Sequence, residues 1–346
     1  DNEIWLNESG VPVWDDYPGP VCDPNSPYRA TMSEQADFII QNALYARVNG
    51  VDNIFFFSLY DECGNAPENF NPPYFPPEQC GSNPPPPDYA GDAFGLFRNA
   101  AAAPTCATQH PYPGTPRPSL AAYQLLTKYF VNVNWLWRAI LGEQGSGNGL
   151  HELIAFYQPH TQSRVLGMWT ITDEPATAVF NSTNSQQSGL LISPDGVAQP
   201  ITATNGVFTL TLAGATNDNT PTGEVYYAIG GRPFLLIEQD DVAPATTITA
   251  PVTAVGSAVV SWTGNDLGSN IADFDLTVSE NGEPAAAWLT RTTAVSASYT
   301  SLIPGSSYTF TVYGRDQAGN VSGGKSTTVF APILDNHIYL PSIQKP

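Results

Sequence analysis

The sequence is poor in charged residues, and above all in positively charged ones. Asp, Glu, Lys and Arg make up only 13% of its 346 residues, against the roughly 25% typical of soluble domains. Lys and Arg together number 12 and Asp and Glu 32, which gives a formal net charge of −20. Because no basic patch can be assembled from so few cations, nucleic acids and anionic membrane surfaces are excluded as expected partners. A neutral, hydroxyl-rich ligand such as a polysaccharide is compatible with this composition.

Long hydrophobic runs are also missing. No apolar stretch is long enough to span a bilayer, and the longest one, IFFFSLY from Ile54 to Tyr60, predicts a buried strand. We find neither a signal peptide nor an initiator methionine, and the first predicted strand begins within a few residues of Asp1. We therefore expect Asp1 to be a processed or truncated end.

Cysteine is scarce, and all four cysteines lie in the first third of the chain. They form no C-x-x-C pair, so neither a zinc nor a haem site is predicted, and we expect no metal or cofactor. An even number among Pro- and Gly-rich loops favours two disulfides and hence an oxidising, extracellular setting. Three pairings are open, and four free buried thiols are the alternative. The preferred pairs are Cys63–Cys80 and Cys22–Cys106.

The pattern of the sequence changes near residue 140. Before this point short apolar strands alternate with helices, as in a parallel α/β unit. One helix begins with Thr31 and Glu34, the spacing of a capping box, and the strand that follows it is continuously apolar, as strands buried on both faces are. The strands and helices predicted in this part are residues 4–6, 31–50, 51–60 and 116–130.

Beyond that point the sequence predicts only β structure. Alternating strands separated by turn signals indicate an antiparallel β-sandwich over residues 149–240. A second sandwich is predicted over residues 241–332, and residues 333–346 form an apolar tail. The expected fold class is therefore multidomain, α/β over residues 1–140 followed by two all-β sandwiches.

The second predicted sandwich resembles the fibronectin type III family over residues 243–331. The run LIPGSSYTFTVYGRDQAGNVS from Leu302 is similar to a motif of that family almost position by position, with Tyr308 as its corner tyrosine. Trp262, in VVSWTG, matches the tryptophan of the family's second strand. The resemblance implies a spacer or adhesion module and no catalysis.

The N-terminal segment resembles clan A glycoside hydrolases. WLNESGVPVW, from Trp5, is similar to the end of the seventh strand of their (β/α)8 barrel, where W-[LIV]-T-E-[TFS]-G is common and the glutamate is the nucleophile. FFFSLYDE, from Phe55, stands where the eighth strand should be, and TPRPSLAAYQLLTKYF, from Thr115, resembles the closing helix. Over residues 1–240 the resemblance implies the last part of a (β/α)8 barrel followed by a β-sandwich.

The same resemblance assigns catalytic roles and exposes what is missing. Glu8 matches the nucleophile of a retaining glycosidase, which needs a second carboxyl group about 5–5.5 Å away. The fourth-strand Asn-Glu that would supply this acid/base is not in the sequence, and neither are the first six strands. We therefore expect a remaining barrel segment, from the same precursor or another chain, as a partner. The alternative for Glu8 is a solvated glutamate in a turn.

Four further residues are candidates for substrate binding because they lie at or near predicted strand ends, where barrels present their sites. Aromatic rings stack on the apolar faces of sugars, and carboxylates accept hydrogen bonds from sugar hydroxyls. Loop packing for the aromatic residues and solvation for the acidic ones are the alternatives. The four are Tyr60, Trp14, Asp61 and Glu62.

Together these features favour a secreted retaining glycoside hydrolase that acts on a polysaccharide or an oligosaccharide. The rival is a non-enzymatic extracellular surface, filament or adhesion protein, which uses the sandwiches as scaffold and assembles through its apolar tail. Among the N-x-S/T sequons we choose Asn181, in NST, as the candidate glycosylation site.

Overall fold

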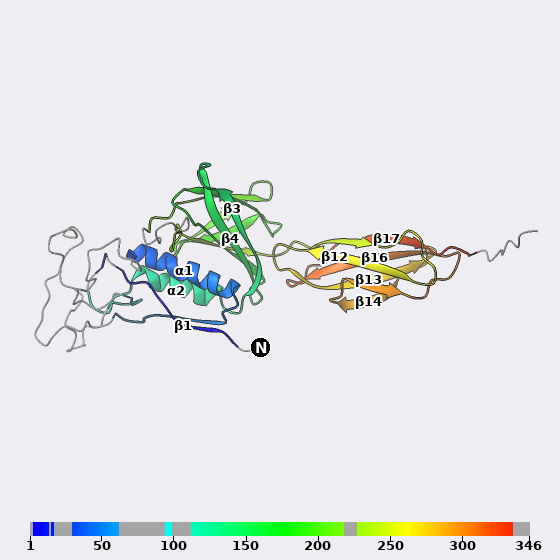
Figure 1. Ribbon diagram of the computed structural model, residues 1–346, viewed down its shortest axis with the longest axis horizontal. Coiled ribbons are helices and arrows are strands. Elements are labelled where there is room, and N and C mark those ends of the chain that lie inside the picture. The colour runs from blue at the N-terminus through cyan, green and yellow to red at the C-terminus, as the bar shows by residue number, and fades with distance from the viewer. Residues whose placement is uncertain are drawn as a thin grey trace, which may run out of the picture. The chain divides into compact units, whose positions relative to one another are not determined.

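The computed structural model divides the chain into two compact units, residues 1–240 and residues 241–346 (Figure 1). Within the described residues no helix is long and apolar enough to cross a membrane. Predictions that fall on undescribed residues stay predictions; these residues include Trp14, Glu62, all four cysteines and nearly all of the tail. The structure describes residues 3–13, 15–16, 30–61, 94–98, 112–217 and 227–334.

The first unit begins with two parallel strands and two helices. Strand β1 pairs in parallel with β2, as the alternation of strands and helices predicts. Helix α1 begins at a capping box, in which the Thr31 hydroxyl accepts from the Glu34 N–H and the Glu34 carboxylate accepts from the Thr31 N–H. A closed barrel is not seen in the described part of the chain. The elements are β1 (Trp5–Ser9), α1 (Met32–Val48), β2 (Asn53–Phe56) and α2 (Pro118–Tyr129).

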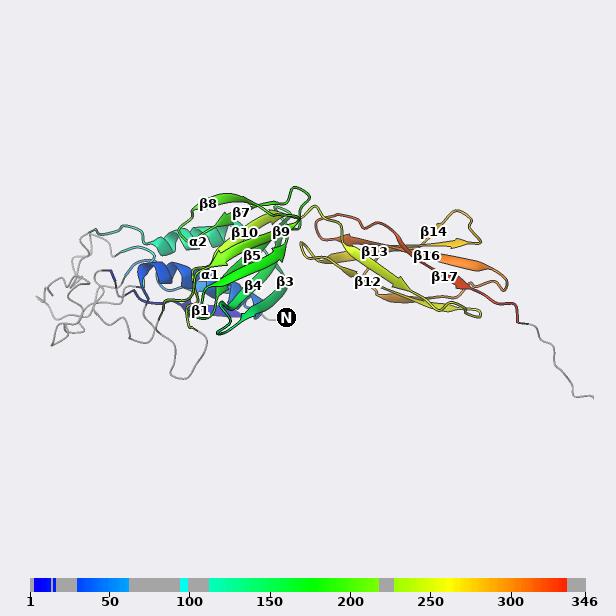
Figure 2. The same cartoon turned by 90° about the horizontal axis from the view of Figure 1, so that it is seen from above.

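A β-sandwich completes this unit, and its first strand begins at Asn134, earlier than the sequence pattern indicates. The larger sheet has six strands in the order β3-β4-β5-β10-β7-β8, and the smaller has two, β6 and β9 (Figure 2). All pairs in both sheets are antiparallel. The strands are β3 (Asn134–Glu143), β4 (Asn148–Gln158), β5 (Ser163–Thr170), β6 (Ala176–Asn181), β7 (Ser188–Ile192), β8 (Ala198–Thr202), β9 (Val207–Leu212) and β10 (Phe234–Gln239).

The six-stranded sheet is covered on both faces. Ile154, Phe156 and Trp169 pack with the apolar side chains of α1 and α2 in one core. Leu153 and Leu166, which point the other way along the same strands, pack with residues of β6 and β9 in a second core. This explains why β4 and β5 are buried along almost their whole length. Each large side chain buried in this way contributes about 1.5–3 kcal/mol.

Close contact between α1 and the sheet depends on Gly167 of β5. A Cβ atom at this position would lie 2.0 Å from the Leu44 side chain, closer than any carbon can approach. Leu44 is fully buried there, and its neighbour Ile40 is 1% exposed. The glycine therefore lets the helix lie directly on the sheet.

The second unit is a sandwich of two antiparallel sheets. One sheet has the order β11-β12-β15 and the other β14-β13-β16-β17. Trp262, Phe310 and Leu276 lie in the core between them. The strands are β11 (Ala245–Thr249), β12 (Ala258–Asn265), β13 (Ile271–Glu280), β14 (Ala286–Thr292), β15 (Ser296–Tyr299), β16 (Ser307–Asp316) and β17 (Lys325–Phe330).

Hydrogen bonds of the Tyr308 side chain stabilise the turn before β16. The side chain is fully buried, and its hydroxyl accepts a hydrogen bond of 2.9 Å from the Ile303 N–H and donates one of 3.3 Å to the Ser301 carbonyl. This is the tyrosine corner of immunoglobulin-like sandwiches, at the residue that the sequence motif predicts.

Replacing Tyr308 by Phe should lower the free energy of unfolding of residues 241–334 by about 1 kcal/mol, because two hydrogen bonds are lost while the ring stays in place. Urea unfolding followed by tryptophan fluorescence measures this change. Tyr313→Phe on the same strand is the control, because the Tyr313 hydroxyl has no hydrogen bond in the described structure. Equal losses in the two variants would contradict the corner's role.

Candidate functional site

Glu8 lies at an irregular point of β1. Leu6 stands opposite Ile54 and Ser9 opposite Phe56, so that Asn7 and Glu8 together face the single residue Phe55 across the pair. This two-against-one arrangement is a β-bulge, which redirects the side chains at a strand end and is frequent beside active sites. The Glu8 side chain is exposed. The candidate nucleophile therefore stands open to solvent at the carboxyl end of a parallel strand.

The end of β1 is anchored by hydrogen bonds, whereas the Glu8 side chain is exposed. The Ser9 carbonyl accepts a hydrogen bond of 3.0 Å from the Phe57 N–H. The Ser9 hydroxyl accepts one of 2.6 Å from the Asn42 side chain of α1. A Cβ atom at Gly10 would lie 2.3 Å from the Phe57 carbonyl oxygen, so this approach requires glycine. These bonds fix the backbone on which Glu8 is carried.

Tyr60 lies just beyond the end of β2. Its side chain is 46% exposed, and its ring centroid is 5.4 Å from that of Phe97 in a tilted arrangement. Glu8 lies in the carboxyl half of β1, and Tyr60 follows the carboxyl end of β2 by four residues. Both side chains are exposed, and binding of sugar by Tyr60 stays a prediction.

Asp61 does not belong to this open surface, and its placement revises the expectation that it binds substrate. The residue is 5% exposed, and its two oxygens accept hydrogen bonds of 2.6 and 2.7 Å from the two terminal nitrogens of Arg117. The Gly95 N–H donates a further bond of 2.8 Å. With its oxygens committed in this way, Asp61 serves the fold.

Arg117 is the centre of a buried cluster of charges. Besides Asp61 it contacts Asp16 at 2.8 Å, and Asp16 also contacts Arg98 at 2.8 Å. Burial opposes the charge of Arg117, but Asp61 and Asp16 outweigh it and raise the pKa of the guanidinium. Burial also raises the pKa of Asp61 against the effect of the arginine. A raised pKa favours the charged form of Arg117 but the neutral form of Asp61. The bidentate geometry favours the pair in which both groups are ionised.

Sequence reasoning missed this cluster, although one signal was available. Arg117 is among only 12 basic residues of the chain, and it stands directly before Pro118, at the N-cap of α2 without capping that helix by its side chain. A cation at a helix N-terminus is unfavourable unless carboxylates neutralise it. The position of Arg117 therefore predicts nearby acids.

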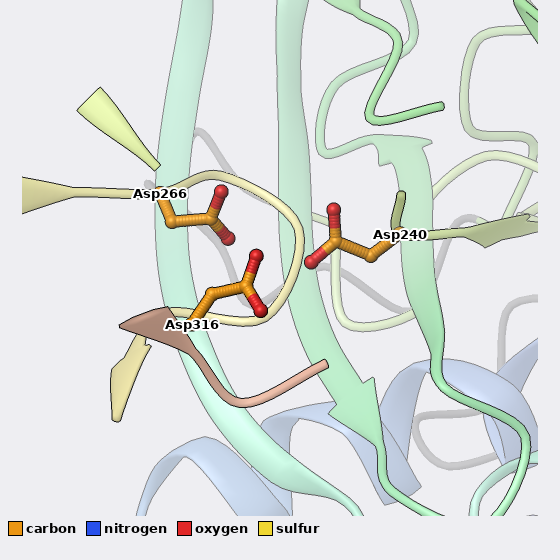
Figure 3. A group of neighbouring side chains, drawn as sticks. All are labelled: Asp240, Asp266 and Asp316. Atoms are coloured by element: carbon orange, nitrogen blue, oxygen red, sulfur yellow. The ribbon is translucent and has the colours of Figure 1, made fainter. Parts of the chain in front are cut away.

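The second unit contains a pair of neighbouring carboxylates, Asp266 in the loop after β12 and Asp316 at the end of β16 (Figure 3). One Asp266 oxygen accepts three backbone N–H bonds, from Gly268, Ser269 and Asn270, at 2.6–3.1 Å. Burial raises the pKa of Asp316, while hydrogen bonds from Asn320 oppose this. Within this unit both carboxylates serve to shape loops.

Asn181 is the last residue of β6, and its side chain is exposed. Its carbonyl accepts a hydrogen bond of 2.8 Å from Arg164. Glycosylation at this residue stays a prediction.

Comparison with protein families found one match, the fibronectin type III domain, over residues 243–330. Residues 243–330 form a fibronectin type III domain. A solved structure of fibronectin(III)-like modules of Clostridium thermocellum CbhA is similar to 25% of the chain at 18% identity, with 97% of its own length covered and a TM-score of 0.21. A search of curated protein sequences found no match.

Distant structural neighbours of the chain include glycoside hydrolases. A family 39 glycoside hydrolase from Bacteroides cellulosilyticus is 19% identical with a TM-score of 0.40, and the similarity covers 69% of this chain. This chain spans about a third, 34%, of the length of that enzyme. A β-1,2-glucanase from Parabacteroides distasonis is 10% identical with a TM-score of 0.21, covering 59% of this chain and 36% of its own.

Replacing Arg117 by Met should destabilise the first unit by about 3–5 kcal/mol, because it leaves the Asp61 carboxylate buried without its cation, while Asp16 keeps Arg98. Arg47→Met is the matched control. Its ion pair with Asp52 is partly exposed, at 33% and 42%, and such pairs contribute about 1 kcal/mol or less. Chemical denaturation of the full chain measures both variants. A loss at Arg117 no larger than at Arg47 would contradict the structural role of the cluster.

Proposed function

We propose that the chain carries the nucleophile strand and the accessory domains of a secreted retaining glycoside hydrolase that acts on a polysaccharide or an oligosaccharide. The observation that supports this function best is the exposed Glu8 in a β-bulge at the carboxyl end of a parallel strand pair. That is the edge at which barrel enzymes place their catalytic groups. The anchoring of Ser9 by α1 gives Glu8 the rigid support that a nucleophile needs.

In the proposed mechanism the Glu8 carboxylate attacks the anomeric carbon of the sugar and displaces the leaving group. A second carboxyl group protonates the leaving oxygen, and then removes a proton from the water that hydrolyses the glycosyl-enzyme ester. Asp61 is unsuited to this second role because Arg117 occupies both of its oxygens. The acid/base is therefore assigned to the remaining barrel segment.

The remaining segment is proposed as a partner on the strength of an uncovered sheet face. Trp5 is 54% exposed and Phe55 50% exposed, and their ring centroids are 5.7 Å apart on adjacent strands. Ile54 and Phe56, the neighbours of Phe55, pack on the opposite side with the helices. A parallel sheet is stable when both of its faces are covered, so the face with Trp5 and Phe55 fits further barrel strands.

Tyr60 is proposed to stack against a sugar ring. Its half-exposed ring is held against Phe97, and the residue follows the carboxyl end of β2. Trp14 and Glu62, which lie outside the described residues, are proposed as further contacts. The fibronectin type III domain is proposed as a spacer with no part in the chemistry.

The rival function is that of a non-enzymatic extracellular scaffold, which the fibronectin type III domain favours. The two differ in what they require of Glu8. A scaffold needs no reactive carboxylate there, whereas the hydrolase loses turnover without it.

The decisive test uses the natural protein that contains this chain and a panel of 2-deoxy-2-fluoro glycosides with activated leaving groups. We expect a covalent glycosyl adduct on the peptide that contains Glu8, detected by mass spectrometry. Glu8→Gln should abolish this adduct and lower kcat/KM on the order of 10³-fold or more, since the attacking group is removed.

Glu3→Gln is the control, because Glu3 is exposed and stands just before β1, away from its carboxyl end. This variant should keep both the adduct and the turnover. An adduct on a different carboxylate, or undiminished turnover by Glu8→Gln, would overturn the assignment of the nucleophile. The absence of any adduct or turnover across the panel would favour the scaffold.

A further inference from the structure

The first half of α1 is joined to the β-sandwich of the same unit by polar contacts. Glu34 accepts hydrogen bonds of 2.8 and 3.0 Å from the side chains of Thr216 and Asn217. Gln41 accepts one of 2.9 Å from the Gly230 N–H and donates one of 2.9 Å to the Gly231 carbonyl. We call these contacts the α1 joint. They link segments about 180–190 residues apart in sequence.

Asp37 stands between these two anchors on the same face of the helix. It follows Glu34 by three positions and precedes Gln41 by four, which places all three side chains in one row. Asp37 is 5% exposed, and its Oδ1 atom has no hydrogen-bond partner among the described residues. The joint therefore buries a carboxyl group without the partners that its two neighbours have.

The charges around Asp37 do not compensate for this burial. Among the described residues, Arg232 is the cation that acts on Asp37, and its guanidinium bonds to Asp195 at 3.0 Å and to the Ser33 hydroxyl at 3.2 Å. Arg232 is thus shared with Asp195, whose pKa is lowered by a hydrogen bond from Ser193 and by Arg232. The other groups that face Asp37 are carboxylates, Glu34 on its own helix and Asp195 on the loop between β7 and β8.

We propose that Asp37 makes the α1 joint sensitive to pH: the joint is closed while the Asp37 carboxyl carries a proton, and it loosens when that carboxyl ionises. A protonated carboxyl is neutral and tolerates burial, whereas a carboxylate without a partner requires solvation. Full solvation of the buried Oδ1 atom requires the helix to move away from the sandwich.

The direction of the effect follows from the balance of protons. Burial raises the pKa of Asp37 to about 7, although Arg232 opposes this, and in the unfolded chain the pKa returns to the ordinary aspartate value of 3.8. Between pH 3.8 and about pH 7 the folded state thus binds more protons than the unfolded state. The stability that the protonated group contributes is complete below pH 4 and is lost as the pH rises through about 7.

The joint also connects to the strand that carries Glu8. Gln35, next to Glu34, donates hydrogen bonds of 3.0 and 3.1 Å to the carbonyls of Val11 and Phe94. Asn42, next to Gln41, donates to the Ser9 hydroxyl. Movement of α1 therefore reaches the support of Glu8. This connection to catalysis rests on the proposed function, whereas the pH sensitivity of the joint does not.

Hydrogen exchange of the full chain between pH 5.5 and 8.5 tests the proposal, with each rate corrected for the intrinsic pH dependence of exchange. In the wild type, protection of residues 32–41 and 227–232 should fall at least tenfold across pH 7. Asp37→Asn should remove this change, because the amide does not ionise. The fibronectin type III domain provides the internal control, and its protection should stay constant.

A second variant keeps the test decisive even where Asp37→Asn fails to fold. Asp195→Asn frees Arg232 and removes a like charge, so it should move the midpoint of the transition to lower pH. Direct titration of the Asp37 carboxyl by carbon NMR should give a midpoint near 7. A midpoint near 4, a transition that persists in Asp37→Asn, or no transition in the wild type would each overturn the proposal.

Discussion

The burial of one sheet on both of its faces is the constraint on which the first unit depends. β4 and β5 have almost no exposed residue, so the unit needs a layer on each side. The strands β6 and β9 supply one layer, and the helices α1 and α2 supply the other. The parallel pair that carries Glu8 is in turn held by those helices. The sandwich therefore positions the candidate site indirectly, through the helices that pack on it.

The scarcity of cations shapes the interior of this unit. Buried carboxylates are stable when each has a partner, and three of the few arginines are used in this way: Arg117 for Asp61, Arg164 for Glu238 and Arg138 for Glu152. Glu34 has neutral donors in their place. Asp37 is buried with the shared Arg232 as a nearby cation, and burial raises its pKa against the effect of that arginine.

Local sequence signals predicted the elements that depend on local contacts. The capping box at Thr31 and Glu34 placed the start of α1, and the motif around Tyr308 placed the fibronectin type III domain because its corner bonds join residues 301–308. The start of β3 was not placed, although Asn132 adopts the positive φ of a turn just before it, because the strand character of residues 134–140 depends on pairing with β4.

The role of Asp61 was beyond the sequence for the same reason. Its partner Arg117 lies 56 positions away, and only the tertiary fold brings the two together. The candidate role of Glu8, unlike the role of Asp61, depends on features close to it in the chain: a bulge in β1 and the end of that strand. The pairing with β2 shows the bulge, and no residue pattern within β1 alone predicts it.

The exposed face of β1 and β2 limits how this chain can work as an enzyme. Trp5 and Phe55 present large apolar surfaces there, and parallel pairs with one bare face are rarely stable in water. A covering segment that supplies further parallel strands would also bring strand ends to the edge where Glu8 stands. The same contact that completes the hydrophobic core would thus complete the pair of carboxyl groups. On the proposed function, folding and catalysis therefore both require the same covering segment. It would stabilise β1 by packing on Trp5 and Phe55, and it would bring the acid/base close to Glu8.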